Sequence, residues 1–248
     1  MVDDLTAKQA ASFDRASEVY ERSRPEYPAE AIDWLLPPAA RSVLDLGAGT
    51  GKLTRALTAR GLEVYAVDPS LKMLEQLRAA VPDAIVHPGS AEDIPLASQS
   101  VDAVLVAQAW HWADQDVALP SVARVLRPGG TLGLVWNLRD ERVPWVARLT
   151  EVMHRATGES FLDNSVIQTG PFGPLEEAQF EWSMEFDRPG LIELLKSRSY
   201  YIIASPDEQA SLEAAVHDLL DHDPDVGGKT VWKMPYRTHA FRMRLPLA

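Results

Sequence analysis

The stretch VLDLGAGTGKLT, residues Val43–Thr54, decides the fold of this chain. It opens with apolar residues around one acid, Asp45, runs into three glycines and continues into a segment that predicts a helix. A glycine loop between a strand and a helix lets the backbone approach a ligand closely at the carboxyl edge of a sheet. The loop therefore predicts a binding site, and we expect its N–H groups and the helix N-terminus to face the ligand.

Short apolar runs alternate with helical stretches on both sides of this loop, which is typical of βαβ units around a mostly parallel sheet. Ser70 is expected to cap the helix after the second strand, and Pro120 to lie in the first turn of a later helix, before a turn RPGG at 127–130. Further on, FEWSMEF and VWKMPYRTHAFRMRL alternate as strands do, and the second of these is expected to be an edge strand or a hairpin partner, with Pro235 at an edge or bend. Five earlier strands are predicted at residues 41–46, 62–68, 84–88, 101–107 and 131–136.

Composition limits the class of protein. With 248 residues, 46% of them hydrophobic, and no run of 18 apolar residues, the chain is expected to form one large α/β domain and to span no membrane. The N-terminus lacks the pattern of a secretion signal, so a cytoplasmic location is expected. The absence of cysteine excludes disulfides and a thiolate nucleophile, and the scattered histidines predict no metal site. A net charge of −12, from 24 basic and 36 acidic residues, argues against nucleic acid as a partner.

The spacing of the glycines and two acids indicate the ligand. Gly47, Gly49 and Gly51 are spaced G-x-G-x-G, whereas a dinucleotide loop is expected to read G-x-G-x-x-G. Asp45 adds negative charge beside the loop, which suits a diphosphate poorly. Asp68 ends the second predicted strand, where a carboxylate can accept both hydroxyls of a ribose. A nucleoside with a cationic centre fits both acids, and S-adenosylmethionine is such a ligand.

In the motifs VLDLGAGTGKLT, VYAVDPS, GSAEDIPL, VDAVLVAQAWHWAD and ARVLRPGGTLGLVW, and in their order, the chain resembles the class I S-adenosylmethionine-dependent methyltransferases. The likeness is to the small-molecule branch, which includes ubiquinone/menaquinone methylases and trans-aconitate methyltransferase-like proteins. It implies a doubly wound, Rossmann-like α/β fold with a seven-stranded, mostly parallel sheet and an antiparallel last strand. It also implies S-adenosylmethionine as cofactor and S-adenosylhomocysteine as product.

The resemblance also implies roles for individual residues. The methionyl part of the cofactor is expected near the glycine loop, with Asp45 near its ammonium group, and the ribose on Asp68. Met73 is expected to pack on the adenine, and Ser90 stands where the family often has an acid that contacts the adenine amino group. The full set of expected cofactor-binding residues is Tyr20, Arg24, Asp45, Gly47, Ala48, Gly49, Gly51, Asp68, Pro69, Met73, Ser90, Ala91, Glu92, Ala107 and Gln108.

Tyr20 and Arg24 belong to a helical N-terminal segment, and its resemblance to the Y-x-x-x-R-P stretch of related proteins implies that it covers the cofactor. They are spaced i, i+4 and so lie on one helix face, and a guanidinium there suits a carboxylate. The alternative is a solvated arginine beside a core tyrosine. We expect a single methyltransferase domain with this lid at 1–40, a cofactor-binding half at 41–136, a cap or insertion for the substrate at 137–228 and a final strand at 229–248.

The expected acceptor is a small organic molecule methylated at oxygen or carbon. His111, just past the fourth strand, is a candidate general base, or it merely shapes the pocket. Trp110, Trp112, Trp136 and Asn137 are candidates for substrate binding, although one of the paired tryptophans can equally belong to the core. Two other functions compete: an NAD-dependent oxidoreductase, and a regulator that binds S-adenosylmethionine without catalysis. A monomer or a homodimer is expected.

Overall fold

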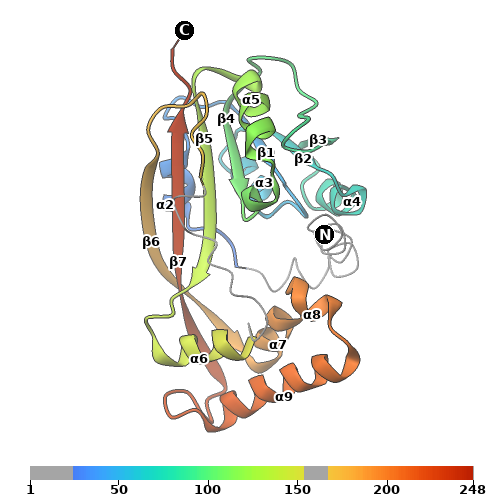
Figure 1. The fold of residues 1–248 in the computed structure, drawn as a ribbon, viewed down its shortest axis with the longest axis vertical. Coiled ribbons are helices and arrows are strands. Elements are labelled where there is room, and N and C mark those ends of the chain that lie inside the picture. Colours follow the sequence, from blue (N-terminus) through green and yellow to red (C-terminus); the bar gives the residue numbers. More distant parts are fainter. Residues whose placement is uncertain (1–24, 154–166, 248) are drawn as a thin grey trace. The chain divides into compact units, whose positions relative to one another are not determined.

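The structure is a computed structural model that describes residues 25–153 and 167–247 (Figure 1). Its seven strands form one sheet in the order β3-β2-β1-β4-β5-β7-β6. The strands are β1 Ser42–Leu46, β2 Glu63–Asp68, β3 Ile85–Pro88, β4 Val101–Ala107, β5 Leu126–Arg139, β6 Glu176–Asp187 and β7 Val231–Arg244. The predicted α/β class with a seven-stranded sheet is confirmed, and the five earlier strands overlap their predicted positions, although β5 is longer at both ends than residues 131–136.

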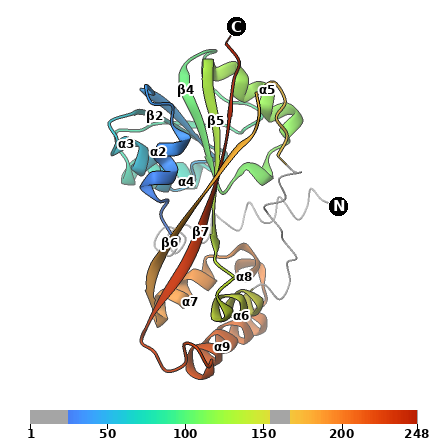
Figure 2. The ribbon, with the colours of Figure 1, turned by 90° about the vertical axis from the view of Figure 1, so that its left-hand side faces the viewer.

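Helices cover both faces of the sheet (Figure 2). Residues from α2 and α3 pack with Ala103 and Leu105 of β4, whereas residues from α5 pack with Val104 and Val106 of the same strand. This alternation follows from the two-residue period of a strand. The described helices are α2 Ala29–Leu35, α3 Lys52–Thr58, α4 Leu71–Ala80, the short 3-10 helix η1 Trp110–Trp112, α5 Gln115–Val125, α6 Pro144–Met153, α7 Arg188–Lys196, α8 Ser199–Ile203 and α9 Pro206–His222.

The first five strands are parallel, and the strand order reverses between β1 and β4. Every residue of β1 is buried, as expected for a central parallel strand covered by helices on both faces. In open α/β sheets a ligand binds outside the carboxyl ends of the strands where the order reverses. Here that place is formed by the loop after β1, which contains the three glycines, and the loop after β4, which leads to η1.

The last two strands correct one expectation from the sequence. β7 is not an edge strand, because it lies between β5 and β6, and β6 forms the edge. The amide of Leu245 donates to the carbonyl of Gly130, and the amide of Asp140 donates to that of Pro235, so β7 runs antiparallel to β5. Pro235 is tolerated because its neighbour Asp140 lies just past the end of β5, where this ladder stops.

Two predictions around α5 were wrong. Pro120 is the sixth residue of α5 and lies inside the helix, where both it and Asp116 are exposed, so water can reach the carbonyl that proline leaves without a donor. The RPGG segment is not a separate turn but part of β5, which begins at Leu126. The register between β4 and β5 shifts there, from Val101 opposite Leu126 to Ala103 opposite Thr131, so the extra residues form a bulge. By contrast, Ser70 caps α4 as expected and accepts from the amide of Met73.

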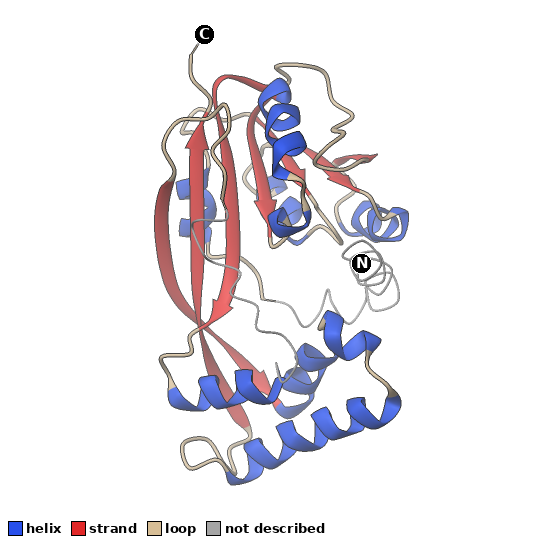
Figure 3. Cartoon of the chain, viewed as in Figure 1, coloured by secondary structure: helices blue, strands red, loops and turns tan. Residues whose placement is uncertain are grey.

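The described residues divide into two compact units. The main unit contains residues 26–137, 167–180 and 238–247, and the second unit contains residue 25 and residues 138–153 and 181–237. In the second unit, helices α6, α7 and α9 lie beside the ends of β6 and β7 (Figure 3). Their buried side chains form one cluster that includes Trp232 and Tyr236. The sequence-based division into lid, cofactor half, cap and final strand stays a prediction.

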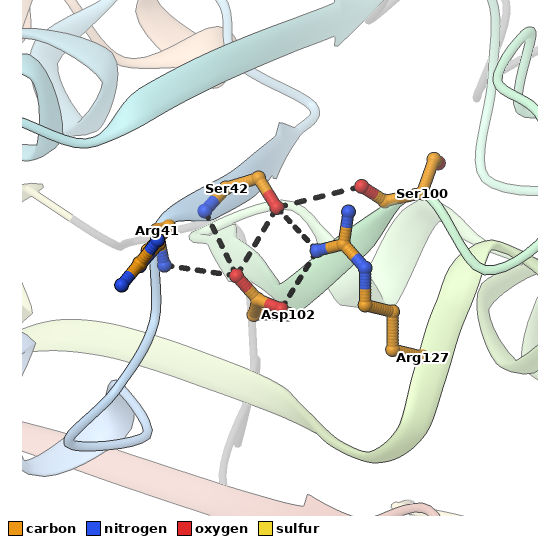
Figure 4. A network of polar contacts seen from close by, with 5 residues as sticks. All are labelled: Arg41, Ser42, Ser100, Asp102 and Arg127. Atoms are coloured by element: carbon orange, nitrogen blue, oxygen red, sulfur yellow. Dashed lines mark hydrogen bonds and ion pairs between the residues drawn. The ribbon is translucent and has the colours of Figure 1, made fainter.

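A polar network fixes the amino-terminal edge of the sheet in the main unit (Figure 4). The Asp102 carboxylate accepts from the amides of Arg41 and Ser42, at 2.8 and 3.0 Å, and from the Arg127 guanidinium at 2.7 Å. Burial alone would raise the pKa of Asp102, but these donors outweigh it and lower the pKa to about 2. The network therefore holds the start of β1 against β4 and β5, at the edge opposite the glycine loop.

Candidate cofactor and acceptor site

The backbone of the glycine loop is bonded to β2 rather than open to a ligand. The amides of Gly47 and Ala48 both donate to the carbonyl of Val67, at 2.8 and 3.1 Å, and the amide of Gly51 donates to the carbonyl of Ala48. The amide of Gly49 donates to Asp68 Oδ2 at 2.9 Å. The expectation that these N–H groups face a ligand was therefore wrong for these four residues. A loop whose amides are already used offers little to a diphosphate.

The three glycines have different reasons for being glycine, although all have positive φ. A Cβ on Gly47 would lie 2.7 Å from Cβ of Ala109, so the loops after β1 and β4 touch there. A Cβ on Gly51 would lie 2.9 Å from Leu77 of α4. At Gly49, with φ +55°, a Cβ would meet no heavy atom of the described part of the chain within 4 Å. Gly49 thus borders open space at the position where the strand order reverses.

Asp68 lies beside this space at the end of β2 and is 9% exposed. Its Oδ2 accepts from the amide of Gly49, and its Oδ1 accepts from the amide of Ser70 at 2.9 Å. An ionised carboxylate has about four acceptor positions, so it can accept from several donors at once. The structure brings together the acid and the glycine loop that the sequence linked to a ribose.

Asp45 is fully buried under the loop. Its Oδ2 accepts from the Thr54 hydroxyl of α3 at 2.6 Å, and its Oδ1 has no hydrogen-bond partner. Burial raises the pKa of Asp45 to about 7; the Thr54 hydroxyl and amide act against this rise, and the charge of Asp68 adds to it. Asp45 has no exposed surface, so a ligand lying on the loop would not contact this carboxyl group directly.

The loops after β2 and β3 supply the other expected cofactor residues. Met73 is 5% exposed, whereas Pro69 is exposed at the start of this segment. Ser90 Oγ accepts from the amide of Asp93, and Glu92 accepts from the amide of Asp114 at 2.9 Å. The hydrogen bonds from Ser90 and from this amide outweigh burial and lower the pKa of Glu92. Ala91 packs against the core beneath.

The end of β4 is tied to the end of β5. After Ala107, Gln108 has φ +58°, which is unusual for a residue other than glycine, and its amide donates to the carbonyl of Val135. Its Nε2 donates to the carbonyl of Asn137 at 3.2 Å. The Asn137 side chain accepts from the Thr238 hydroxyl at 2.6 Å and donates to the carbonyl of Glu26 at 3.0 Å. Asn137 is therefore engaged by the protein, which reduces its capacity to hold a substrate.

The aromatic segment after β4 divides into a core part and an exposed part. Trp110 is 2% exposed, packs in the core with Trp136 and donates to Gln115 Oε1 at 3.2 Å, so it is the core member of the pair. Trp112 is 41% exposed, and its ring centroid lies 4.8 Å from that of His111. Trp136 is buried against Phe241. Of the three tryptophans, Trp112 is the one with surface for an acceptor.

His111 is neutral at pH 7. Loss of water around the ring lowers its pKa to about 4, although the side chain is itself exposed and so keeps part of its hydration. The direction of this shift matters more than its size, because a lowered pKa makes the imidazole a weaker proton acceptor. The structure therefore supports pocket shaping and hydrogen bonding by His111 more than general-base chemistry.

Two sequence-based expectations cannot be placed, because Tyr20 and Arg24 lie outside the described residues. Within residues 25–153 and 167–247, no three His, Asp or Glu side chains are grouped as metal ligands. In the same ranges no helix has the length and apolar character needed to cross a bilayer.

Thr54 is the polar residue of this site that sequence reasoning missed. It is fully buried on the face of α3 that also carries Leu53 and Leu57. A hydroxyl on the apolar face of a short helix requires a partner. That signal was visible in the sequence, but the partner, Asp45, became evident only from the fold.

Comparison with known proteins agrees with this geometry. A family model described as a methyltransferase domain matches residues 44–134. An uncharacterized methyltransferase of Mycobacterium tuberculosis is 51% identical over 234 residues, which are 94% of this chain and 96% of the relative. A second relative, from Schizosaccharomyces pombe, is 36% identical over 232 residues, 90% of this chain and 91% of its own, and its name is also methyltransferase-like. The chain belongs to the class I S-adenosylmethionine-dependent methyltransferases.

Solved structures support the same fold. A structure from Anaeromyxobacter dehalogenans, provisionally named a type II methyltransferase, has a TM-score of 0.69 and 23% identity and covers 91% of this chain and 99% of its own. At that identity the likeness concerns the fold alone. Membership of the family makes the chain an enzyme of the methyltransferase class and excludes the NAD-dependent oxidoreductase considered from the sequence.

Proposed function

We propose that this enzyme transfers a methyl group from S-adenosylmethionine to an oxygen or carbon of a small organic acceptor. The observation that carries the cofactor assignment is the open space at Gly49, bordered by Asp68 and lying above the buried Asp45. Two acids and a loop with its amides already bonded favour a cationic nucleoside over a diphosphate. The residues present thus fit S-adenosylmethionine.

When bound, S-adenosylmethionine supplies a methyl group activated by a sulfonium. The chain's own residues bind and orient: Asp68 accepts ribose hydroxyls, Gly49 permits close approach, and Met73 packs on the adenine. Methyl transfer gains much of its rate from holding the two reacting groups in line. The close contact between the loops of Gly47 and Ala109 keeps the cofactor loop and the start of the acceptor segment in a fixed relation.

On the acceptor side, Trp112 offers an exposed aromatic surface and His111 a neutral imidazole. Oxygen as accepting atom is supported by a malonyl-[acyl-carrier protein] O-methyltransferase of Salmonella typhimurium, which is 35% identical over 166 residues, 64% of each chain. An ionised carboxylate oxygen needs no base, which suits the lowered pKa of His111. We assign recognition of the acceptor to residues 137–228, because binding sites are commonly built on segments that can change without altering the scaffold that carries them.

A product assay tests this function. The enzyme is incubated with S-adenosylmethionine labelled in the methyl group and with a panel of small carboxylic acids, phenols, alcohols and carbon acids. The labelled methyl group should appear on one class of acceptor, and one S-adenosylhomocysteine should be released for each methyl group transferred. Tight cofactor binding with no transfer to any class, or to a relevant cell extract of small molecules, would favour the non-catalytic regulator.

Replacing Asp68 by Ala tests the ribose assignment. We expect binding of S-adenosylmethionine to weaken by about 1.5–3 kcal/mol, because charge-assisted hydrogen bonds are lost. Calorimetric titration measures the affinity, and a melting curve checks that the loss of the Gly49 and Ser70 bonds has not unfolded the protein. Unchanged affinity would remove Asp68 from this role.

Replacing His111 by Gln separates its two interpretations. We expect the affinity for S-adenosylmethionine to stay nearly constant and turnover to fall less than about 100-fold, because a weakly basic imidazole contributes less than an efficient general base. Steady-state kinetics across pH 5–8 measure the effect. A larger loss, together with disappearance of a pH step in kcat, would establish His111 as the base.

A further inference from the structure

Two carboxylates stand at the ends of neighbouring strands in the proposed cofactor site. Asp45 of β1 pairs with Ala66 of β2, two residues before Asp68, and with Leu105 of β4. Leu105 and Ala66 are apolar and fully buried, so neither offsets a charge on Asp45. From α3 it receives the Thr54 hydroxyl, and Asp68 is the titratable group whose charge acts on it.

The two oxygens of Asp45 have unequal surroundings. Oδ2 has a short bond of 2.6 Å from Thr54, and Oδ1 is buried with no hydrogen-bond partner. An ionised carboxylate with one bare oxygen and an acidic neighbour is costly, so the proton is retained close to neutral pH. A cation arriving above the loop reverses this balance, because it stabilises the ionised form.

We propose that Thr54 is a positioning residue for Asp45, and that binding of the cofactor causes Asp45 to release a proton. The inference rests on the proposed binding of S-adenosylmethionine at the glycine loop. Asp45 loses its proton to solvent when the cationic cofactor binds, and the Thr54 hydroxyl, which donates to the carboxylate, sets the pH at which this occurs. Thr54 does not touch the cofactor; it acts through Asp45.

The shift in the pKa of Asp45 to about 7 supports this inference and gives its sign. Below pH 7 the free protein keeps the proton, so binding must release it and affinity rises with pH. Well above pH 7 the carboxylate is already ionised and the dependence ends. At pH 6 the cofactor's own amine stays protonated whether free or bound, so it does not confuse the measurement.

The test is calorimetric titration of the full-length wild type with S-adenosylmethionine at pH 6–8, in buffers of different ionisation enthalpy. We expect release of close to one proton per cofactor at pH 6 and about fivefold tighter binding at pH 7 than at pH 6. Asp45→Asn should release no proton at pH 6 and lose the dependence. Binding by the wild type without proton release, or equally tight at pH 6 and pH 7, overturns the inference and leaves the proposed function intact.

Thr54 itself is tested with two substitutions. Thr54→Val keeps the shape but removes the hydroxyl, so its affinity at pH 7 should be about fivefold weaker and should recover toward pH 8. Thr54→Ser keeps the hydroxyl and should titrate like the wild type. Thr58→Val is the matched control, because Thr58 lies on the same helix and its hydroxyl donates to the carbonyl of Arg55.

The outcomes are distinguishable. If Thr54→Val and Thr54→Ser shift the pH dependence equally, the hydroxyl does not set it and the role of Thr54 is refuted. If Thr54→Val does not fold, the proton count of the wild type and of Asp45→Asn still decides the linkage, and the comparison of Thr54→Ala with Thr54→Ser decides whether the hydroxyl sets the pH dependence. If the wild type does not bind S-adenosylmethionine at any pH, the proposed function itself is refuted, and the inference that rests on it is refuted with it.

Discussion

Gly49→Ala should lower the affinity for S-adenosylmethionine about 100-fold while the protein stays folded. The added methyl group meets no heavy atom of residues 25–153 and 167–247 within 4 Å, so we expect it to project into the space assigned to the cofactor. A loss of about 2.7 kcal/mol is expected from blocking a close backbone approach. Titration with S-adenosylmethionine and S-adenosylhomocysteine measures the effect, and both ligands should be affected.

Gly61→Ala is the matched control for this substitution. Gly61 also has positive φ, +74°, and a Cβ there would meet no heavy atom of the described residues within 4 Å, but it precedes the start of β2, whereas Asp68 lies at the opposite end of that strand. Each substitution should cost about 1–2 kcal/mol of stability, because alanine is strained at positive φ. Only Gly49→Ala should lose binding. If it binds within threefold of the wild type, the cofactor does not lie against this glycine.

Asp102→Ala should lower the free energy of unfolding by about 3 kcal/mol at pH 7. The substitution removes the acceptor for two backbone amides and leaves the Arg127 guanidinium without its carboxylate. Denaturation in urea measures the loss. Asp33→Ala removes an ion pair whose carboxylate is 64% exposed, and it should cost less than about 0.5 kcal/mol. Equal losses in the two variants would contradict the importance of the network.

The same network has a defined pH dependence. Because the folded pKa of Asp102 is lowered to about 2, its stabilisation is fully present above the ordinary pKa of about 4 and disappears as pH falls toward 2. The difference in stability between the wild type and Asp102→Ala should therefore shrink over that range. Cofactor affinity at pH 7 should be the same in both proteins.

Much of the fold was predictable from local patterns. β1, β2 and β4 are apolar runs bounded by turn residues, and parallel strands buried on both faces produce that signal. The position of β7 was not predictable in this way. Proline indicates an edge, but the place of a strand depends on which ladder bonds its neighbours form, and Pro235 lies where the ladder with β5 ends.

In the candidate site, too, some features were predictable from local sequence and others were not. The glycine spacing and Asp68 were sufficient to predict their juxtaposition, because both follow the carboxyl ends of adjacent parallel strands. Sequence could not show that the loop amides are bonded to β2, that Trp110 is core, or that Asn137 is engaged by Thr238 and Glu26. Each of these depends on contacts between residues far apart in the chain.

The network around Asp102 and the glycine loop occupy opposite edges of one sheet. Substitutions at the amino-terminal edge, around Asp102, alter the stability and hence the amount of folded enzyme in a cell. Substitutions at the carboxyl edge, around the glycine loop, alter what the enzyme binds. An engineer who wishes to alter the acceptor can therefore first strengthen the amino-terminal edge. The added free energy of unfolding would let the protein stay folded when destabilising substitutions are made in the acceptor site.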